Sequence, residues 1–328
     1  MFRLFTLFDF DTAYYIFLGI KLLSLFLLIF IWRVFFLKDE VDALFYPFCL
    51  LAFGGTIFVD LYAGNISIFE QLLIWSGLLF FQKGRLALFC IFVGIAALFK
   101  VFPGLFLFAL LLTDDRHRNS YLIVSLALVG AAMAASALLS PGLFTDFLVK
   151  AGGLDERGII NPSTLALSRD VMESLCTKLH LSLPSWTGTG VFLLVCASIL
   201  SLTWFAIKGK LPNLKCNPRV TVFLLTLVYA LVLPRFKDYS YILLIPAAYF
   251  ILKQPIKLNL YPSALIIFLM FSPRLPPPAD VFYKLSQQYF ALILAFFIWG
   301  LFLYSIEYGG TGFPQDSSKT YGVPPHHS

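Results

Sequence analysis

The sequence predicts an all-α membrane protein, a polytopic bundle of transmembrane helices. Of its 328 residues, 59% are hydrophobic and only 13% are charged, whereas a soluble domain has roughly 45–50% apolar and about 25% charged residues. Phe is also abundant, with 37 residues, which suits side chains that face lipid. These values exclude a soluble globular enzyme, and the high hydrophobicity excludes a disordered chain.

The apolar segments have the length of membrane helices, about 20 residues for a hydrocarbon core of roughly 30 Å. With the long segment 86–112 they predict about 9–11 membrane segments. We expect residues 1–308 to form the transmembrane domain and residues 309–328, rich in Gly, Ser and Pro, to form a disordered cytoplasmic tail. The other apolar segments are 13–36, 43–62, 66–82, 120–140, 187–207, 220–233, 239–252, 259–272 and 287–306.

The short loops predict the orientation, because cytoplasmic loops carry an excess of Lys and Arg. The strongest basic cluster spans 208–219 and is placed inside, so that segment 141–186 becomes an extracytoplasmic loop. Lys83 and the charged turn 114–118 then lie inside as well, at the two ends of segment 86–112. We therefore expect 86–112 to be a pair of half-helices that turn near Lys100 at the outer face.

No motif for a metal, a nucleotide or a redox cofactor is present. The five Cys are scattered without a CxxC pair, and the four His form no set of ligands. A Walker loop, a zinc signature, a nucleophile elbow and a GxGxxG before a helix are all missing from the sequence. We expect no metal and no cofactor, and we assign the net charge of +6 to cytoplasmic loops and not to a nucleic-acid partner.

Ionisable and polar residues at membrane depth are costly, so each one marks a candidate functional position. On the predicted orientation these residues gather at or near the outer face, and the binding or catalytic site is expected there. They are Asp60, Asn65, Glu70, Gln71, Lys100, Asn161, Arg235, Lys237 and Asp238.

Lys100 is followed by Pro103 between two apolar half-helices. A cation at this depth would suit a lipid-linked phosphate, which needs a positive charge near the headgroup level. The alternative is a Lys at a helix end whose side chain simply extends to the interface. The sequence leaves the two interpretations open.

The segment that follows Gly64 contains a helix start. Ser67 and Glu70 have the spacing of a capping box, in which the two side chains bond the first backbone amides of a helix. Their presence therefore has a structural explanation. The structural explanation is weaker for Gln71 and for Asn65, which could also cap the helix, and both could form hydrogen bonds with a sugar or a headgroup.

Two further polar segments lie on the outer side. In the segment 234–239, Arg235, Lys237, Asp238 and Tyr239 could bind a phosphate or a sugar. The alternative is an interfacial belt, where such residues are common, but cations on the outer side contradict the orientation rule and favour binding. The segment 161–169 predicts a turn at Asn161 and then a short amphipathic helix on the membrane. Arg157 and Arg169 could contact an anionic headgroup there, or be solvated loop charges.

These elements together resemble glycosyltransferase family 87, the C-type membrane glycosyltransferases that depend on polyprenyl-phosphate-mannose. The similar elements are Gly64-Asn65 before an apolar helix, the basic turn Lys83-Gly84-Arg85, and the segment from Gly94 to Pro103 with Lys100. The segments 161–169 and 234–239 are similar to the outer-loop Asn-x-Ser element and the late Pro-to-Tyr element of the family. The similarity covers residues from about 5 to 255, but its elements are short.

The resemblance implies an α-mannosyltransferase-like hexosyltransferase in the plasma membrane of a prokaryote, active on the extracytoplasmic face. It would transfer a hexose, expected to be mannose, from a polyprenyl-phosphate donor to a lipid or glycan acceptor, with inversion. Cations would stabilise the leaving phosphate and a carboxylate would act as general base. We assign Lys100, Arg235 and Lys237 to the phosphate, and Asn65 and Gln71 to polar contacts.

The resemblance places the catalytic base of the family in an outer loop after its first helix. Segment 13–36 resembles a later family helix, so that loop has no counterpart here, and Asp9, Asp11 and Asp60 are the remaining candidates. We therefore expect a shortened version of the family, a truncated reading frame or an inactive relative. Two other classes stay open: a transporter or flippase, and a non-catalytic membrane partner subunit.

Overall fold

The structure is a computed structural model, and it describes residues 7–153, 156–180, 182, 184, 186–210, 217–254 and 287–308. These residues are almost entirely helical and contain no strand, which confirms the predicted all-α fold. The helices are α1 (Phe10–Ile31), η2 (Trp32–Leu37), η3 (Lys38–Glu40), α2 (Phe45–Tyr62), α3 (Ser67–Gln82), α4 (Leu86–Phe99), η4 (Phe102–Leu112), α5 (Arg118–Leu139), α6 (Pro141–Gly153), η5 (Gly158–Ile160), α7 (Thr164–Leu179), α8 (Thr187–Lys208), α10 (Pro218–Val232), η6 (Asp238–Leu244), α11 (Ile245–Lys253) and α14 (Phe290–Tyr308).

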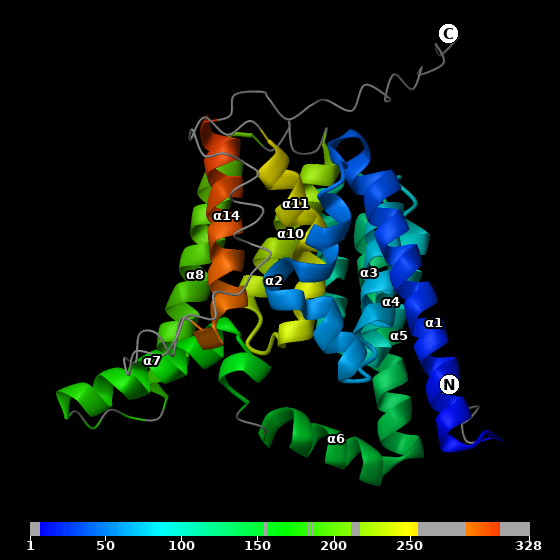
Figure 1. Ribbon diagram of the computed structural model, residues 1–328, viewed down its shortest axis with the longest axis horizontal. Coiled ribbons are helices and arrows are strands. Elements are labelled where there is room, and N and C mark those ends of the chain that lie inside the picture. Colours follow the sequence, from blue (N-terminus) through cyan, green and yellow to red (C-terminus); the bar gives the residue numbers. More distant parts are fainter. Residues whose placement is uncertain are drawn as a thin grey trace.

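Five of the described helical segments are long and apolar enough to cross a membrane: α1 with η2, α2, α5, α8 and α14. They run side by side in the bundle (Figure 1). The most apolar windows of α5 and α8 are only 11% and 17% buried, so these two helices present apolar surface to their surroundings. Such a surface fits lipid and not water, and the chain is an integral membrane protein.

The core of the bundle is built from large aromatic side chains. Trp75 of α3 lies between Trp32 and Phe36 of η2, with ring centroids 6.1 Å and 4.7 Å away. Phe223 of α10 joins the same cluster, 6.2 Å from Trp75. These edge-on and tilted contacts bury side chains of η2, α3 and α10 together, and they pack three separate parts of the chain against one another.

Helix α2 is broken in its middle, where the sequence predicted one continuous segment. Ala52 is extended (ψ 148°), and Phe53, Gly54 and Gly55 have positive φ values of 53°, 77° and 78°. Glycine adopts this conformation without a steric penalty. Phe53 is held in it by packing, since it is 6% exposed and lies against the ring of Tyr241 at 5.6 Å.

The predicted break in segment 86–112 is confirmed. Helix α4 ends at Phe99, Lys100 is extended (φ −146°, ψ 134°), and the 3₁₀ helix η4 begins at Phe102. Gly104 lies against α4, because a Cβ at this position would be 3.6 Å from the Cβ of Ala97. The two half-helices therefore fold back on each other with Lys100 at the turn.

The loop predicted over 141–186 contains more helix than expected. Two helices, α6 and α7, run across one end of the bundle (Figure 1). Helix α7 has 16 residues and begins after Ser163, whose hydroxyl accepts a hydrogen bond from the backbone amide of Ala166 at 3.3 Å. The apolar segment 259–272 and the tail 309–328 lie outside the described residues.

Candidate functional site

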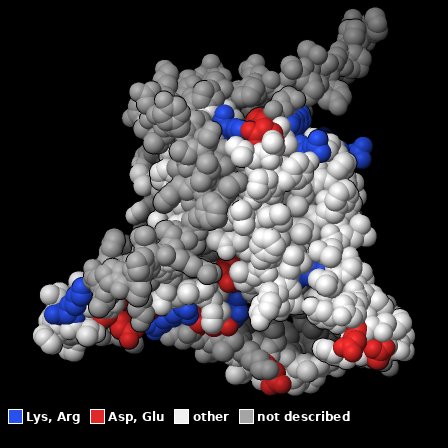
Figure 2. All heavy atoms as spheres, viewed as in Figure 1, with Lys and Arg blue, Asp and Glu red and all other residues white. Residues whose placement is uncertain are grey.

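Charged side chains gather at the two ends of the bundle, and a broad belt of uncharged residues lies between them (Figure 2). We call the end that carries α6, α7 and the start of α1 the site end, and the other the opposite end (Figure 1). The residues predicted to form a site, from Asp60 to Tyr239, lie toward the site end. They come from several separate segments of the chain.

Lys100 is the central cation of the site end. Its ammonium group forms an ion pair with Glu70 and donates a hydrogen bond to the Ser67 hydroxyl at 3.1 Å. The predicted capping box is therefore wrong: the N-cap of α3 is Ile66, which makes no side-chain cap bond. Glu70 pairs with Lys100 because a charged partner stabilises a buried carboxylate more than a backbone amide does. The Ser67 hydroxyl accepts a hydrogen bond from the same ammonium group.

A second ion pair lies deeper and was missed by the sequence analysis. The Lys21 ammonium of α1 lies 2.9 Å from the Asp60 carboxylate of α2 and donates to the Asp60 carbonyl at 2.5 Å. Both side chains are almost fully buried, at 1% and 0% exposure. In the sequence, a Lys inside an apolar helix is the signal that could have indicated this ion pair. Its partner is 39 residues away and is decided by the tertiary structure.

The cations of the late segment share one carboxylate. Glu156 accepts from the Arg235 guanidinium at 2.7 Å and from the Lys237 ammonium at 3.0 Å. Partial burial raises the pKa of Glu156, but the hydrogen bonds and charges of Lys237 and Arg235 outweigh it and hold the pKa below its usual range. Glu156 is another residue that the sequence analysis did not single out.

Tyr239 brings the two groups of cations together. The Lys100 ammonium lies 5.2 Å from its ring centroid, and the Lys237 ammonium lies 6.0 Å from it. Such distances allow a cation–π attraction. Beside it, the partly exposed Asp238 accepts a hydrogen bond from the Tyr239 amide at 2.7 Å. Lys100, Lys237, Asp238 and Tyr239 are thus one cluster, which we call the cation cluster.

Asn161 has a linking position. Its side-chain amide donates to the Glu156 carbonyl at 2.9 Å, and its oxygen accepts from the Phe236 amide at 2.9 Å. Near it, the Ser163 hydroxyl donates to the Pro234 carbonyl at 2.8 Å. These bonds hold the segment before α7 against the segment that carries Arg235 and Lys237. Asn161 therefore helps to position the cation cluster.

The remaining predicted residues have varied surroundings. Gln71 is 2% exposed, and its oxygen has no hydrogen-bond partner among the described residues. Asp9 caps α1 by accepting from the Thr12 amide at 3.1 Å, and Asp11 is exposed in the first turn of that helix. Asn65 lies beyond the end of α2, where its backbone amide donates to the Asp60 carbonyl at 3.4 Å.

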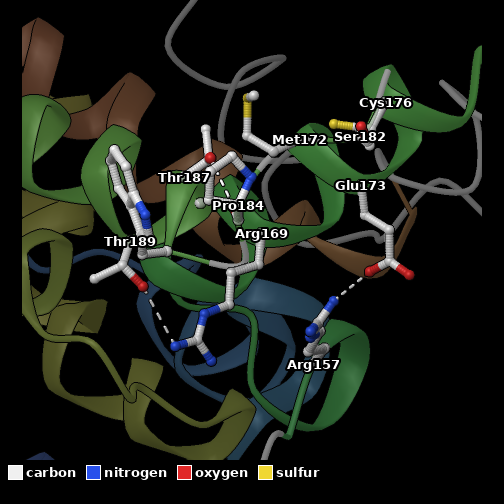
Figure 3. Close-up of a pocket in the computed structure, with 11 residues that line it drawn as sticks. Arg157, Arg169, Met172, Glu173, Cys176, Ser182, Pro184, Thr187 and Thr189 are labelled. Carbon is white, nitrogen blue, oxygen red and sulfur yellow. Dashed lines mark hydrogen bonds and ion pairs between the residues drawn. The ribbon is translucent and has the colours of Figure 1, made fainter. Parts of the chain in front are cut away.

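Two hollows open on the site end. The first, of about 570 Å³, lies between the end of α4, α5 and α6. Its lining is mostly apolar and also contains Ser136 and Ser140, and Lys100 is the charged residue in it. The second, of about 650 Å³, lies between α7 and the start of α8 and has a mixed lining of charged, polar and apolar residues, with Arg169 facing Thr189 (Figure 3).

Comparison with known proteins identifies the family. The model of glycosyltransferase family 87 matches residues 1–234, which is well over half of the 328 residues. No curated protein and no solved structure matches the chain. The matched region includes the turn at Lys100 and α7, and it ends at residue 234, one residue before Arg235.

Proposed function

The chain belongs to glycosyltransferase family 87, and from this premise we propose that it transfers mannose from a polyprenyl-phosphate donor to a lipid or glycan acceptor. A membrane glycosyltransferase has a sugar donor and an acceptor as substrates. The observation that supports a lipid-linked donor is the position of Lys100. Its side chain lines the apolar hollow and also belongs to the cation cluster. The reaction would occur on the extracytoplasmic face of a prokaryotic plasma membrane, to which we assign the site end.

The cations would stabilise the leaving lipid phosphate. As the bond between the sugar and the phosphate breaks, negative charge grows on the phosphate oxygens, and fixed cations lower the energy of that state. Lys100 and Lys237 lie on the same aromatic ring, and Arg235 shares Glu156 with Lys237. Two cations, Lys100 and Lys237, are therefore available within the cation cluster, and Arg235 lies beside it through Glu156.

The apolar hollow would hold the polyprenyl chain. Its residues come from α4, α5 and α6, and α5 presents most of its apolar surface outward. A hydrocarbon chain could enter from the bilayer and lie against Leu98 and Leu139, with its phosphate at Lys100. Apolar walls with one charged group at the end match the two parts of such a donor.

We assign the general base to Asp238. Three other carboxylates near the cation cluster are paired: Asp60 with Lys21, Glu70 with Lys100, and Glu156 with Arg235 and Lys237. Asp238 is partly exposed, and its Oδ1 accepts a hydrogen bond from the neutral backbone amide of Tyr239. Its other oxygen can therefore accept the proton of an acceptor hydroxyl while the cations hold the phosphate.

Reconstituted vesicles with polyprenyl-phosphate-mannose labelled in the sugar test the proposal. Lys100→Ala should reduce mannose transfer by roughly 100-fold or more, because the leaving phosphate loses a cation. Asp238→Asn should abolish transfer while the vesicles still bind the donor. The matched control is Lys83→Ala, which removes a cation at the opposite end, where Lys83 lies over the ring of Phe35 at 4.5 Å.

The outcomes separate the alternatives. Full transfer by Lys100→Ala would contradict the phosphate role, and full transfer by Asp238→Asn would contradict the assignment of the base. Uptake of free sugar into sealed vesicles without any transfer would identify a transporter. Equal loss in Lys83→Ala would show that the loss reflects a general effect of removing a cation.

A further inference from the structure

The hollow between α7 and α8 has a lining unlike that of the apolar hollow beside Lys100. It measures about 650 Å³, and its walls carry Arg157, Arg169, Glu173, Trp186, Thr187 and Thr189. Figure 3 shows Arg169 and Thr189 on one side and Arg157 with Glu173 on the other. None of these side chains is used by the proposed phosphate site, so the hollow needs its own explanation.

The Arg157 cation of the hollow is already paired with carboxylates. The Arg157 guanidinium pairs with Asp170 at 3.2 Å and with Glu173 at 2.6 Å. Arg169 donates to the Thr189 hydroxyl at 3.4 Å. An anionic ligand would have to displace Asp170 and Glu173 from Arg157, and a hydrocarbon chain would remove the charged groups of the hollow from water. A neutral ligand with many hydrogen-bonding groups meets neither obstacle.

The groups that remain accessible suit a sugar. The Glu173 side chain is 70% exposed and offers carboxylate oxygens to hydroxyl groups. Trp186 is 69% exposed and presents an aromatic ring at the same hollow. The apolar C–H face of a hexose packs on such a ring, while its hydroxyls bond to carboxylate, guanidinium and Thr groups around it.

The walls of the hollow are closely packed and hydrogen-bonded. A Cβ at Gly188 would lie 2.8 Å from the Cγ and 2.9 Å from the Cα of Arg169, so α8 approaches the backbone of α7 as closely as a glycine allows. The Tyr289 hydroxyl donates to Asp170 at 2.6 Å and accepts from the Gly158 amide at 3.1 Å. These contacts fix the wall that carries Arg157.

The chain connects this hollow directly to the cation cluster. Glu156 binds Arg235 and Lys237, and the next residue, Arg157, lines the hollow. We propose that the hollow binds a neutral hexose unit of a glycan acceptor. The role as acceptor site rests on the proposed function, whereas the binding of a neutral sugar rests on the hollow alone.

Saturation-transfer NMR with the full chain in nanodiscs tests the binding, with methyl α-mannopyranoside as the probe. We expect binding to the unchanged protein and a loss of roughly tenfold or more in affinity for Trp186→Ala and for Glu173→Gln. The matched control is Trp204→Ala, because Trp204 lies on α8, the helix that Trp186 precedes, is 50% exposed and does not line the hollow. The control should bind the probe as the unchanged protein does.

Three results would overturn the inference: no binding of the probe, unchanged binding by both variants, or stronger binding of glycerol phosphate than of the sugar. In vesicles, the two variants should raise the KM for the glycan acceptor and leave the KM for the donor unchanged. A protein that binds the probe through Trp186 but transfers no mannose would contradict the proposed function alone. Transfer with unchanged acceptor KM in both variants would contradict the acceptor role of the hollow alone.

Discussion

The two ends of the bundle use the same kinds of charged residue in different ways. At the opposite end, Arg219 pairs with Glu40 at 3.1 Å, donates to the Phe36 carbonyl at 3.2 Å and lies 4.7 Å from the ring of Phe250. Lys253 pairs with Asp42. At the site end, by contrast, Lys100 is paired with Glu70 but also lies in the wall of an open hollow.

The difference lies in access. Arg219 is 9% exposed and is enclosed by a carboxylate, a carbonyl and a ring, so its charge serves to connect α10 to the turn after α1. The Lys100 side chain is 33% exposed and has apolar walls leading to it. A cation that is enclosed on all sides stabilises the fold, whereas a cation at the head of a hollow can also meet a ligand.

Breaking the buried pair of Lys21 and Asp60 has the largest expected effect on stability. It tests whether the site end also contains an ion pair that serves only the fold. Lys21→Met should lower the free energy of unfolding by about 3–5 kcal/mol, because the Asp60 carboxylate loses its partner while it stays buried. The thermal unfolding midpoint in detergent measures this loss.

The double variant Lys21→Met with Asp60→Leu is the control for that prediction. It removes both charges and should recover most of the lost stability, since two apolar side chains replace a buried pair. If the double variant is stable and still transfers mannose, Asp60 is not the catalytic base. A double variant as unstable as Lys21→Met would show that the pair contributes through packing and not through charge.

Arg219 gives the next largest effect. Arg219→Met should destabilise the fold by about 3 kcal/mol, because Glu40 keeps its charge without a partner. Transfer per folded molecule should stay unchanged, in contrast to Lys100→Ala. Measuring activity together with the folded fraction separates the two effects. A specific loss of activity in folded Arg219→Met would contradict the assignment of structural cations to the opposite end and of functional cations to the site end.

The smallest effect concerns pH and the Glu156 carboxylate. Because the pKa of Glu156 is held below its ordinary value of 4.5, its contribution to stability is complete above pH 4.5 and is lost as the pH falls through the lowered pKa. The unfolding midpoint should therefore fall between pH 6 and pH 3 by more in the unchanged protein than in Glu156→Gln. An identical fall in both proteins would contradict the ion pairs with Arg235 and Lys237.

Much of the fold could be predicted from the sequence, because hydrophobic length is a local property. The segments 13–36, 66–82 and 187–207 correspond to α1 with η2, α3 and α8, and the turn at Lys100 is confirmed. The break in α2 was missed, although Gly54 and Gly55 allow it. Its position depends on how Phe53 packs against Tyr241, a residue almost 190 positions later.

The candidate site could be predicted only in part. Lys100, Arg235, Lys237 and Tyr239 were recognised as polar residues in an apolar sequence, and the structure brings them together around one ring and one carboxylate. Glu156 and Lys21 were not singled out. The function of a charged residue depends on its partner. Glu156 and Lys237 are 81 positions apart, and Lys21 and Asp60 are 39 apart, so no local sequence pattern predicts either pair.

The sequence by itself determined that this chain is a helical membrane protein with sparse charges, because the transfer of side chains into a hydrocarbon layer depends on composition and length alone. Only the tertiary structure decided which of those charges are enclosed and which line a hollow. Ion pairs and hollows form between segments that are distant in sequence. Their energies depend on burial and on distances of a few ångströms, which the folded packing alone defines.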